Sequence, residues 1–94
     1  MKVIILDSTV LKARRVLRAR LSKFGYEILP YKSPLPKAVI EEYAKKGAIV
    51  VTSSSSLAYK TNGIFIHPEI VSKHNSRTLA TLIIKLITKK MREK

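Results

Sequence analysis

The chain alternates between short apolar runs and longer segments in which apolar residues recur every three or four positions. Four apolar runs are predicted to be strands, and they cover residues 2–6, 26–29, 48–52 and 64–67. Three amphipathic segments are predicted to be helices, at residues 10–24, 37–46 and 77–92. Because strands and helices alternate, we expect parallel pairing with right-handed crossovers. The pattern therefore predicts an α/β fold, a single three-layer domain over residues 1–94 with a mainly parallel four-stranded sheet and helices on both faces.

The helical segments also indicate which side chains form the core. In the first helix, five apolar residues share one narrow face: Val10, Ala13, Leu17, Leu21 and Phe24. In the second helix, four residues are expected to point inward: Val39, Ile40, Tyr43 and Ala44. The last helix is apolar over more than half of its circumference, so we expect a homodimer that covers one flank of residues 77–92. After the serine run at residues 53–56, residues 57–61 are expected to be irregular or to form a single turn.

Polar residues follow two of the predicted strands. The first strand ends at Asp7, Ser8 and Thr9, and the third ends at Thr52, Ser53, Ser54, Ser55 and Ser56. Ligands of open α/β sheets bind beyond the carboxyl ends of the strands, so these residues form one rim if the two strands are neighbours. Taken singly, Asp7 is expected to cap the first helix, and the serines to form a solvated loop. The serine run lacks the glycines and the lysine of a phosphate-binding loop, which argues against a nucleotide site.

The composition limits the class of protein. With 94 residues and a hydrophobic fraction of 46%, the chain suits one packed domain and is too apolar for a disordered basic tail. The absence of Cys excludes disulfides and cysteine zinc sites, and His67 and His74 lack the spacing of zinc ligands. No apolar run approaches the roughly 20 residues of a membrane span, since Lys85 interrupts the best candidate. We therefore expect a cytoplasmic protein without a membrane partner, and the scarcity of Gln, Asn and Cys fits heat adaptation.

The net charge gives the first functional clue. The chain has 19 Lys and Arg residues against 6 Asp and Glu, a formal charge of +13. Such an excess opposes folding by self-repulsion. Nucleic acid is the favoured partner, because its phosphates neutralise the positive charge and counterions are released on binding. An anionic membrane surface ranks well below nucleic acid, and a generically basic small protein is the plainest alternative. The cations expected to contact nucleic acid lie on the first and last helices: Lys12, Arg14, Arg15, Arg18, Arg20, Lys23, Lys85, Lys89 and Arg92.

The order and spacing of the elements carry a further signal. A strand leads to Asp7 and a helix, Gly25-Tyr26-Glu27 opens the second strand, and Gly47 precedes the third. In this order the chain resembles, over residues 2–87, the short PIN-like domains of archaea and bacteria, relatives of the metal-dependent PIN ribonucleases. The family's T-x-D-x-D-F motif is replaced by Thr52-Ser53-Ser54-Ser55-Ser56-Leu57. The family usually has a further acidic residue at the start of its second helix, and Lys37 is the residue nearest to that position by spacing. The first 29 residues also resemble a receiver domain, but no phosphoacceptor aspartate follows the third strand.

The resemblance has consequences for function. PIN-type hydrolysis uses clustered carboxylates to hold divalent metals that activate water. With Asp7 as the one retained acid, it implies a nuclease scaffold that binds RNA, such as ribosomal or transfer RNA, without cutting it. We expect no metal and no cofactor, and we favour RNA over DNA. Tyr31 and Tyr59 fall in predicted loops, where a ring either packs on the core or stacks on an exposed base.

Two alternatives remain open at this point. The first is a small, toxin-like ribonuclease in which Asp7, with Glu41 or Glu42, holds Mg²⁺ or Mn²⁺. The second is an architectural DNA-binding dimer, with its basic helices on phosphates and residues 77–92 at the interface.

Overall fold

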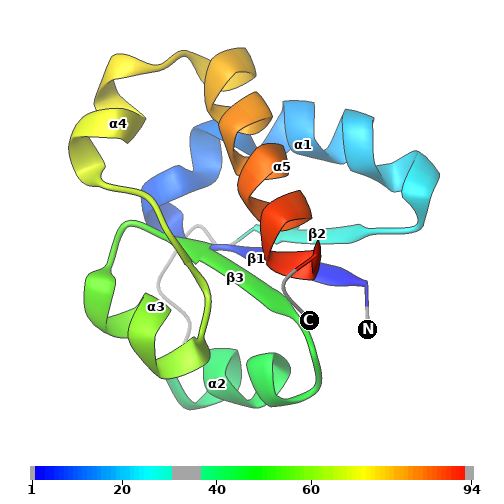
Figure 1. Cartoon of the computed structure of the whole chain (residues 1–94), viewed down its shortest axis with the longest axis vertical. Coiled ribbons are helices and arrows are strands. Elements are labelled where there is room, and N and C mark those ends of the chain that lie inside the picture. The colour runs from blue at the N-terminus through cyan, green and yellow to red at the C-terminus, as the bar shows by residue number, and fades with distance from the viewer. Residues whose placement is uncertain (1, 31–36, 93–94) are drawn as a thin grey trace.

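Four parallel strands form the sheet at the centre of the protein (Figure 1). The computed structural model describes residues 2–30 and 37–92, and the statements below concern these residues. The strands, in the order β2-β1-β3-β4 across the sheet, are β1 (Val3–Leu6), β2 (Glu27–Pro30), β3 (Ile49–Thr52) and β4 (Ile64–Phe65). In the register, Ile5 of β1 lies between Leu29 of β2 and Val50 of β3. This arrangement confirms the predicted α/β fold with a parallel four-stranded sheet.

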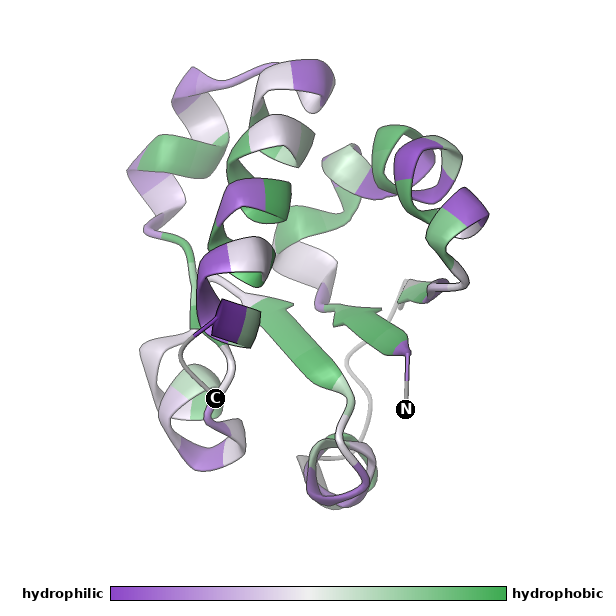
Figure 2. Cartoon of the chain, turned by 45° about the vertical axis from the view of Figure 1, so that its right-hand side comes forward, coloured by the Kyte–Doolittle hydropathy of each residue, from purple (hydrophilic) through white to green (hydrophobic). Residues whose placement is uncertain are grey.

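Helices cover both faces of this sheet, as predicted. One face packs against η1 (Ser8–Ala13), α1 (Arg14–Leu21) and α5 (Ser76–Arg92), and the other against α2 (Lys37–Lys45) and α3 (Ser55–Thr61). The alternation of side chains along β1 sets this division, because Ile4 and Leu6 join the first core and Ile5 joins the second. Figure 2 shows the predominantly hydrophobic strands between helices of mixed character.

The two central strands send the chain to opposite faces of the sheet. After β1 the chain enters η1 and α1 on one face, whereas after β3 it enters α3 on the other. Such a divergence between neighbouring parallel strands is the topological switch point, where open α/β sheets bind their ligands. The chain segments that follow Leu6 and Thr52 therefore meet at the carboxyl edge of the sheet, as the sequence predicted for neighbouring strands.

The first helical segment differs from the continuous helix predicted at residues 10–24. It consists of η1, α1 and η2 (Ser22–Phe24), with a kink at Val10, whose φ of −123° and ψ of 19° are not helical. The core prediction for Phe24 is wrong, because its side chain is 60% exposed. Each residue of a 3-10 turn rotates by about 120° instead of about 100°, and the chain then turns at Gly25 with a φ of 84°. The other predicted core residues are buried: Val10, Ala13, Leu17 and Leu21.

The segment after β3 is more helical than predicted. Residues 55–61 form α3, longer than the single turn expected, because Ser54 Oγ accepts a hydrogen bond from the Leu57 amide at 3.4 Å and caps the helix. Asn62 ends α3 in the left-handed conformation, with a φ of 52°. Tyr59 therefore lies on a helix instead of in a loop, and Tyr31 lies outside the described residues.

Two further predictions are corrected by the structure. The strand predicted at residues 64–67 ends at Phe65, and an unexpected helix, α4 (Pro68–Lys73), begins at a proline whose missing N–H costs nothing there. Val39 was expected to point inward but is 37% exposed, because the first turns of α2 direct Ile40 to the sheet instead.

The last helix follows its prediction closely. Asn75 Oδ1 accepts a hydrogen bond from the Thr78 amide at 2.8 Å and so caps the helix. Of the seven large apolar residues, Met91 alone is exposed, and the rest are buried or half-buried: Leu79, Leu82, Ile83, Ile84, Leu86 and Ile87. One chain thus covers most of the apolar surface for which a homodimer was predicted, and the homodimer stays a prediction. None of the described helices combines the length and the apolar character that crossing a membrane requires.

Candidate functional site

A buried carboxylate lies at the switch point between β1 and β3. Asp7 follows β1 directly and is 9% exposed, and its backbone amide donates to the Val51 carbonyl at 3.0 Å. Its Oδ2 atom accepts hydrogen bonds from two hydroxyls, Thr9 Oγ1 and Thr52 Oγ1, both at 2.9 Å. The structure therefore brings the polar residues after β1 and β3 together, as predicted for neighbouring strands. The Asp7 carboxylate lies between a hydroxyl from each of them.

Each of the two hydroxyls also accepts a hydrogen bond from a backbone amide. Thr9 Oγ1 accepts from the Ser53 amide and Thr52 Oγ1 accepts from the Ser54 amide, both at 3.0 Å. Asp7 occupies the position before η1, but its side chain makes no capping bond to a backbone amide, so the expectation that it caps the helix is wrong. The carboxylate is used instead to hold the two strand-end segments together, since buried charge is costly without such donors.

A hollow of about 340 Å³ opens beside this network, between Thr9, Ser53 and α4. Pro68, Val71 and Ser72 of α4 complete its lining. The Ser53 hydroxyl is buried and has no hydrogen-bond partner among the residues that the structure describes. The remaining serines of the predicted rim are exposed and lie on helices that cover opposite faces of the sheet: Ser8 in η1, and Ser55 and Ser56 in the first turn of α3.

The donor set at this rim does not fit a divalent metal. Mg²⁺ and Mn²⁺ require several anionic oxygens, whereas Asp7 is accompanied here by neutral hydroxyls that already donate to its Oδ2 atom. Within residues 2–30 and 37–92, no three His, Cys, Asp or Glu side chains are grouped so that they could hold a metal ion. Glu41 and Glu42, which the ribonuclease alternative requires, belong to α2 on the far face of the sheet.

The predicted basic residues lie on two helical segments, η1 to η2 and α5, that the fold places side by side. Arg20 Nη1 of α1 donates to Thr81 Oγ1 of α5 at 2.7 Å, and the helices share the core residues Leu17 and Ile83. Together the segments 8–24 and 76–92 hold eleven cations and no Asp or Glu. We call these residues the α1–α5 basic surface: Lys12, Arg14, Arg15, Arg18, Arg20, Lys23, Arg77, Lys85, Lys89, Lys90 and Arg92.

The members of the α1–α5 basic surface differ in exposure. Arg14, Arg20 and Lys90 are half-buried, and the other eight are exposed. Arg20 is thus a link between helices as well as a cation, which sequence reasoning did not anticipate. The hydrogen bond joins residues 61 positions apart, and only the packing of α1 against α5 reveals it.

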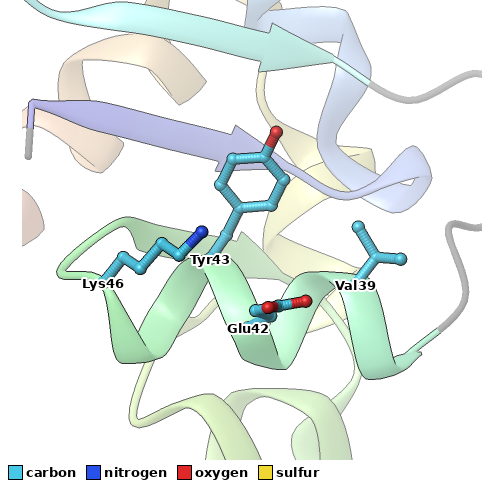
Figure 3. A pocket seen from close by; sticks show the side chains of 4 residues that line it. All are labelled: Val39, Glu42, Tyr43 and Lys46. Atoms are coloured by element: carbon cyan, nitrogen blue, oxygen red, sulfur yellow. The ribbon is translucent and has the colours of Figure 1, made fainter.

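The opposite face of the sheet carries a different kind of surface. A hollow of about 300 Å³ lies on α2. Figure 3 shows the side chains that line it, with the Tyr43 ring pointing from the helix toward the sheet. Val39, Glu42 and Lys46 complete its lining, so that a carboxylate and an ammonium group lie at the same hollow. This mixed surface lacks the one-sided charge of the α1–α5 basic surface.

No protein-family model, curated protein or solved structure matches the chain. Function is therefore inferred from the chemistry of its own surfaces.

Proposed function

We propose that this protein binds nucleic acid without cutting it, with RNA as the favoured partner, through the α1–α5 basic surface. The observation that carries the proposal is the hydrogen bond between Arg20 and Thr81, which joins two helical segments, residues 8–24 and 76–92, that together have eleven cations and no acid. Most of the excess positive charge is thereby concentrated on one face of the sheet.

The placement of these charges opposes folding. Arg14 and Arg18 are four residues apart on α1, and Lys85 and Lys89 are four apart on α5. Like charges at this spacing destabilise a helix by about 0.2–0.5 kcal/mol per pair. A surface that only kept the protein in solution would mix both signs, whereas phosphate groups would neutralise this one and release counterions.

The shape of the surface favours RNA over the major groove of duplex DNA. Two helices packed side by side are about 20 Å wide, whereas the major groove is about 12 Å wide and admits one helix. Neither helix can therefore enter the groove without its neighbour. Backbone contact with folded or single-stranded RNA suits the surface better, and the guanidinium groups of Arg15 and Arg18 can bind phosphates in a bidentate manner.

The ribonuclease alternative lacks this kind of support. Its acids are divided between the rim and α2, and the one acid at the rim already accepts two hydroxyl donors. We therefore expect RNA to remain intact when incubated with the protein and Mn²⁺. Cleavage that Asp7→Asn abolishes would contradict the proposal.

The proposal is tested by two matched triple variants. Arg15→Ala/Arg18→Ala/Lys85→Ala removes three exposed cations from the α1–α5 basic surface. Lys45→Ala/Lys46→Ala/Lys60→Ala removes the same charge from exposed positions on or next to α2 and α3. Binding to a fluorescent RNA hairpin and to duplex DNA of equal length is measured by anisotropy over a range of KCl concentrations.

The first variant should bind the hairpin at least about tenfold more weakly at low salt. The slope of the logarithm of its binding constant against the logarithm of the KCl concentration should be shallower by about 0.7–0.9 for each phosphate that the variant no longer neutralises. The second variant should remain close to the wild type. Equal weakening of binding in the two variants would show that only net charge matters and would overturn the proposed surface. A preference for duplex DNA would overturn the choice of RNA.

A further inference from the structure

Arg20 of the α1–α5 basic surface has a half-buried side chain that links α1 to α5, which lie side by side in Figure 1. Its Nη1 atom donates to Thr81 Oγ1 of α5 at 2.7 Å. The Thr81 hydroxyl donates its own proton to the Arg77 carbonyl at 3.0 Å, so toward Arg20 it can act only as an acceptor. Because a guanidinium group is planar and rigid, this bond holds the Arg20 head group in one orientation where the two helices meet.

The bond to Thr81 leaves most of the Arg20 guanidinium without a partner. Thr81 Oγ1 is the one acceptor that this side chain has among residues 2–30 and 37–92. Since Nη1 is occupied, the Nε and Nη2 atoms remain, and the parallel N–H bonds on that edge match two oxygens of a single anionic group. In the described part of the chain, the Ser53 hydroxyl is the one buried polar side-chain atom without a partner. The Nε and Nη2 atoms of Arg20 are therefore accessible from solvent.

A link between helices does not by itself account for an arginine at this position. A neutral side chain could donate the same single hydrogen bond to Thr81 without the desolvation cost of a half-buried charge. The two helical segments contain no acid that offsets this cost. Instead, Arg77 and Lys85 lie four residues before and four residues after Thr81, on the same face of α5, and both are exposed. Three cations thus lie around one hydroxyl, and an anion is the ligand that suits them.

We propose that the Nε–Nη2 edge of Arg20 binds one phosphate group of the RNA backbone in a bidentate manner. Thr81 is the positioning residue for this contact, because it fixes the plane of the guanidinium. Arg77 and Lys85 neutralise the charge of the same phosphate and of its neighbours along the strand. The anion is a phosphate group and not an isolated carboxylate, since the eleven cations of the α1–α5 basic surface suit a polyanion.

This inference rests on the proposed function and deepens it, because it assigns one phosphate contact to a fixed geometry. A contribution from charge alone survives the exchange of Arg20 for lysine, which keeps the positive charge. A contribution from the paired N–H donors does not survive that exchange, since an ammonium group acts as a point charge. Net charge and geometry can therefore be separated experimentally.

The first test uses three variants that leave the net charge unchanged. Arg20→Lys removes the paired donors, and Thr81→Val removes the acceptor that orients Arg20. Thr88→Val is the matched control, because Thr88 Oγ1 donates to the Ile84 carbonyl at 2.9 Å but accepts nothing from an arginine within the described residues. Arg20→Lys and Thr81→Val should each weaken binding of the RNA hairpin about two- to tenfold, as expected for the loss of one hydrogen bond. Thr81→Ser should restore the affinity, and Thr88→Val should match the wild type.

A second measurement observes the Arg20 guanidinium in the wild-type protein and is independent of any effect of the variants on folding. Each arginine Nε–H group gives a proton–nitrogen NMR signal, and the signal that disappears in Arg20→Lys belongs to Arg20. Inorganic phosphate and the RNA hairpin are added separately at constant ionic strength. Each should shift the Arg20 signal at lower concentrations than the signal of Arg92, which ends α5. Equal responses of all arginine signals would show a diffuse ion atmosphere and overturn the inference.

The source of the phosphate is decided by the same titrations. If inorganic phosphate shifts the Arg20 signal and the hairpin does not, the site takes free phosphate and the assignment to RNA is wrong. If an oligoglutamate shifts it at lower concentrations than the hairpin does, the anion belongs to an acidic protein and the inference is overturned.

The outcomes also separate this inference from the proposed function. If Arg20→Lys and Thr81→Val bind the hairpin like the wild type, while Arg15→Ala/Arg18→Ala/Lys85→Ala binds it weakly, Arg20 holds no phosphate and the proposed function survives. If none of these variants weakens binding, both proposals are wrong.

Discussion

The helices on the two faces of the sheet differ in their charge, although each face buries an apolar core. The face under α1 and α5 carries the α1–α5 basic surface, with eleven cations and no acid. The face under α2 and α3 carries Glu41 and Glu42 among its lysines. Both faces bury an apolar core against the same strands, so the fold does not require one of them to be basic. The one-sided charge therefore points to a role outside folding.

The basic face is also the one with the larger described core. Fourteen buried residues belong to the cluster that includes Leu17 and Ile83, and five belong to the cluster that includes Leu57. Burial of apolar surface is the main source of stability, at about 25 cal/mol per Å². A large core can thus offset the repulsion among the cations above it. Substitutions in the two cores, at the switch point and among the surface charges each test this difference between the faces.

The largest effect is expected from matched core substitutions on the two faces. Leu17→Ala removes a side chain with no exposed surface from the larger cluster, and Leu57→Ala removes one that is 5% exposed from the smaller cluster. Leucine to alanine changes in cores cost about 2–5 kcal/mol, depending on how far the cavity collapses. We expect a cost near the upper end for Leu17 and near the lower end for Leu57, measured by urea denaturation. Equal costs would show that the two cores support the fold equally.

A smaller effect is expected at the carboxylate between the faces. Asp7 ties the segment that leads to α1 to the segment that leads to α3. Asp7→Ala leaves the buried Thr52 hydroxyl without its acceptor, which should cost about 1–3 kcal/mol in the free energy of unfolding, measured by urea denaturation. Asp7→Asn keeps an oxygen that accepts both hydroxyls and should cost less. If the two substitutions cost the same, the negative charge itself, and not the pair of hydrogen bonds, stabilises the switch point.

Much of this architecture could be predicted from local pattern. The apolar runs at β1 and β3 and the polar residues after them predicted that Asp7 and Thr52 share one rim if the two strands are neighbours, because carboxyl ends of neighbouring parallel strands share an edge. The pairing of β1 with β3, which the pattern left open, is what the structure adds. Contacts between helices could not be predicted in this way. The bond from Arg20 to Thr81 depends on how α1 and α5 pack, and no periodicity encodes it.

The exposed aromatic residues show the same limit. Phe24 was assigned to the core by helical spacing, which failed where the helix tightened to a 3-10 turn. The exposure of Phe65 could have been found, since it alternates with Ile64 and Ile66 in an edge strand. A pattern thus locates faces of an element reliably only as long as the geometry of the element is regular.

The smallest expected effect is the change in stability when single surface cations are removed, and its sign differs between the two faces. Arg18→Gln removes a like-charge pair with Arg14, and Lys85→Gln removes one with Lys89, so each should stabilise the protein by about 0.2–0.5 kcal/mol. Lys45 lies four residues after Glu41 on α2, and Lys45→Gln should therefore destabilise it by a similar amount. Urea denaturation at low KCl measures both effects, and added salt should shrink both differences.

The same substitutions connect stability to function. Because Arg18→Gln should also weaken RNA binding, a gain in stability together with a weaker affinity would show that the basic face is maintained for its partner at the expense of the fold. Destabilisation by Arg18→Gln, Lys85→Gln and Lys45→Gln alike would instead mean that the cations of α1 and α5 stabilise their own helices. The charge asymmetry between the two faces would then lose its functional meaning.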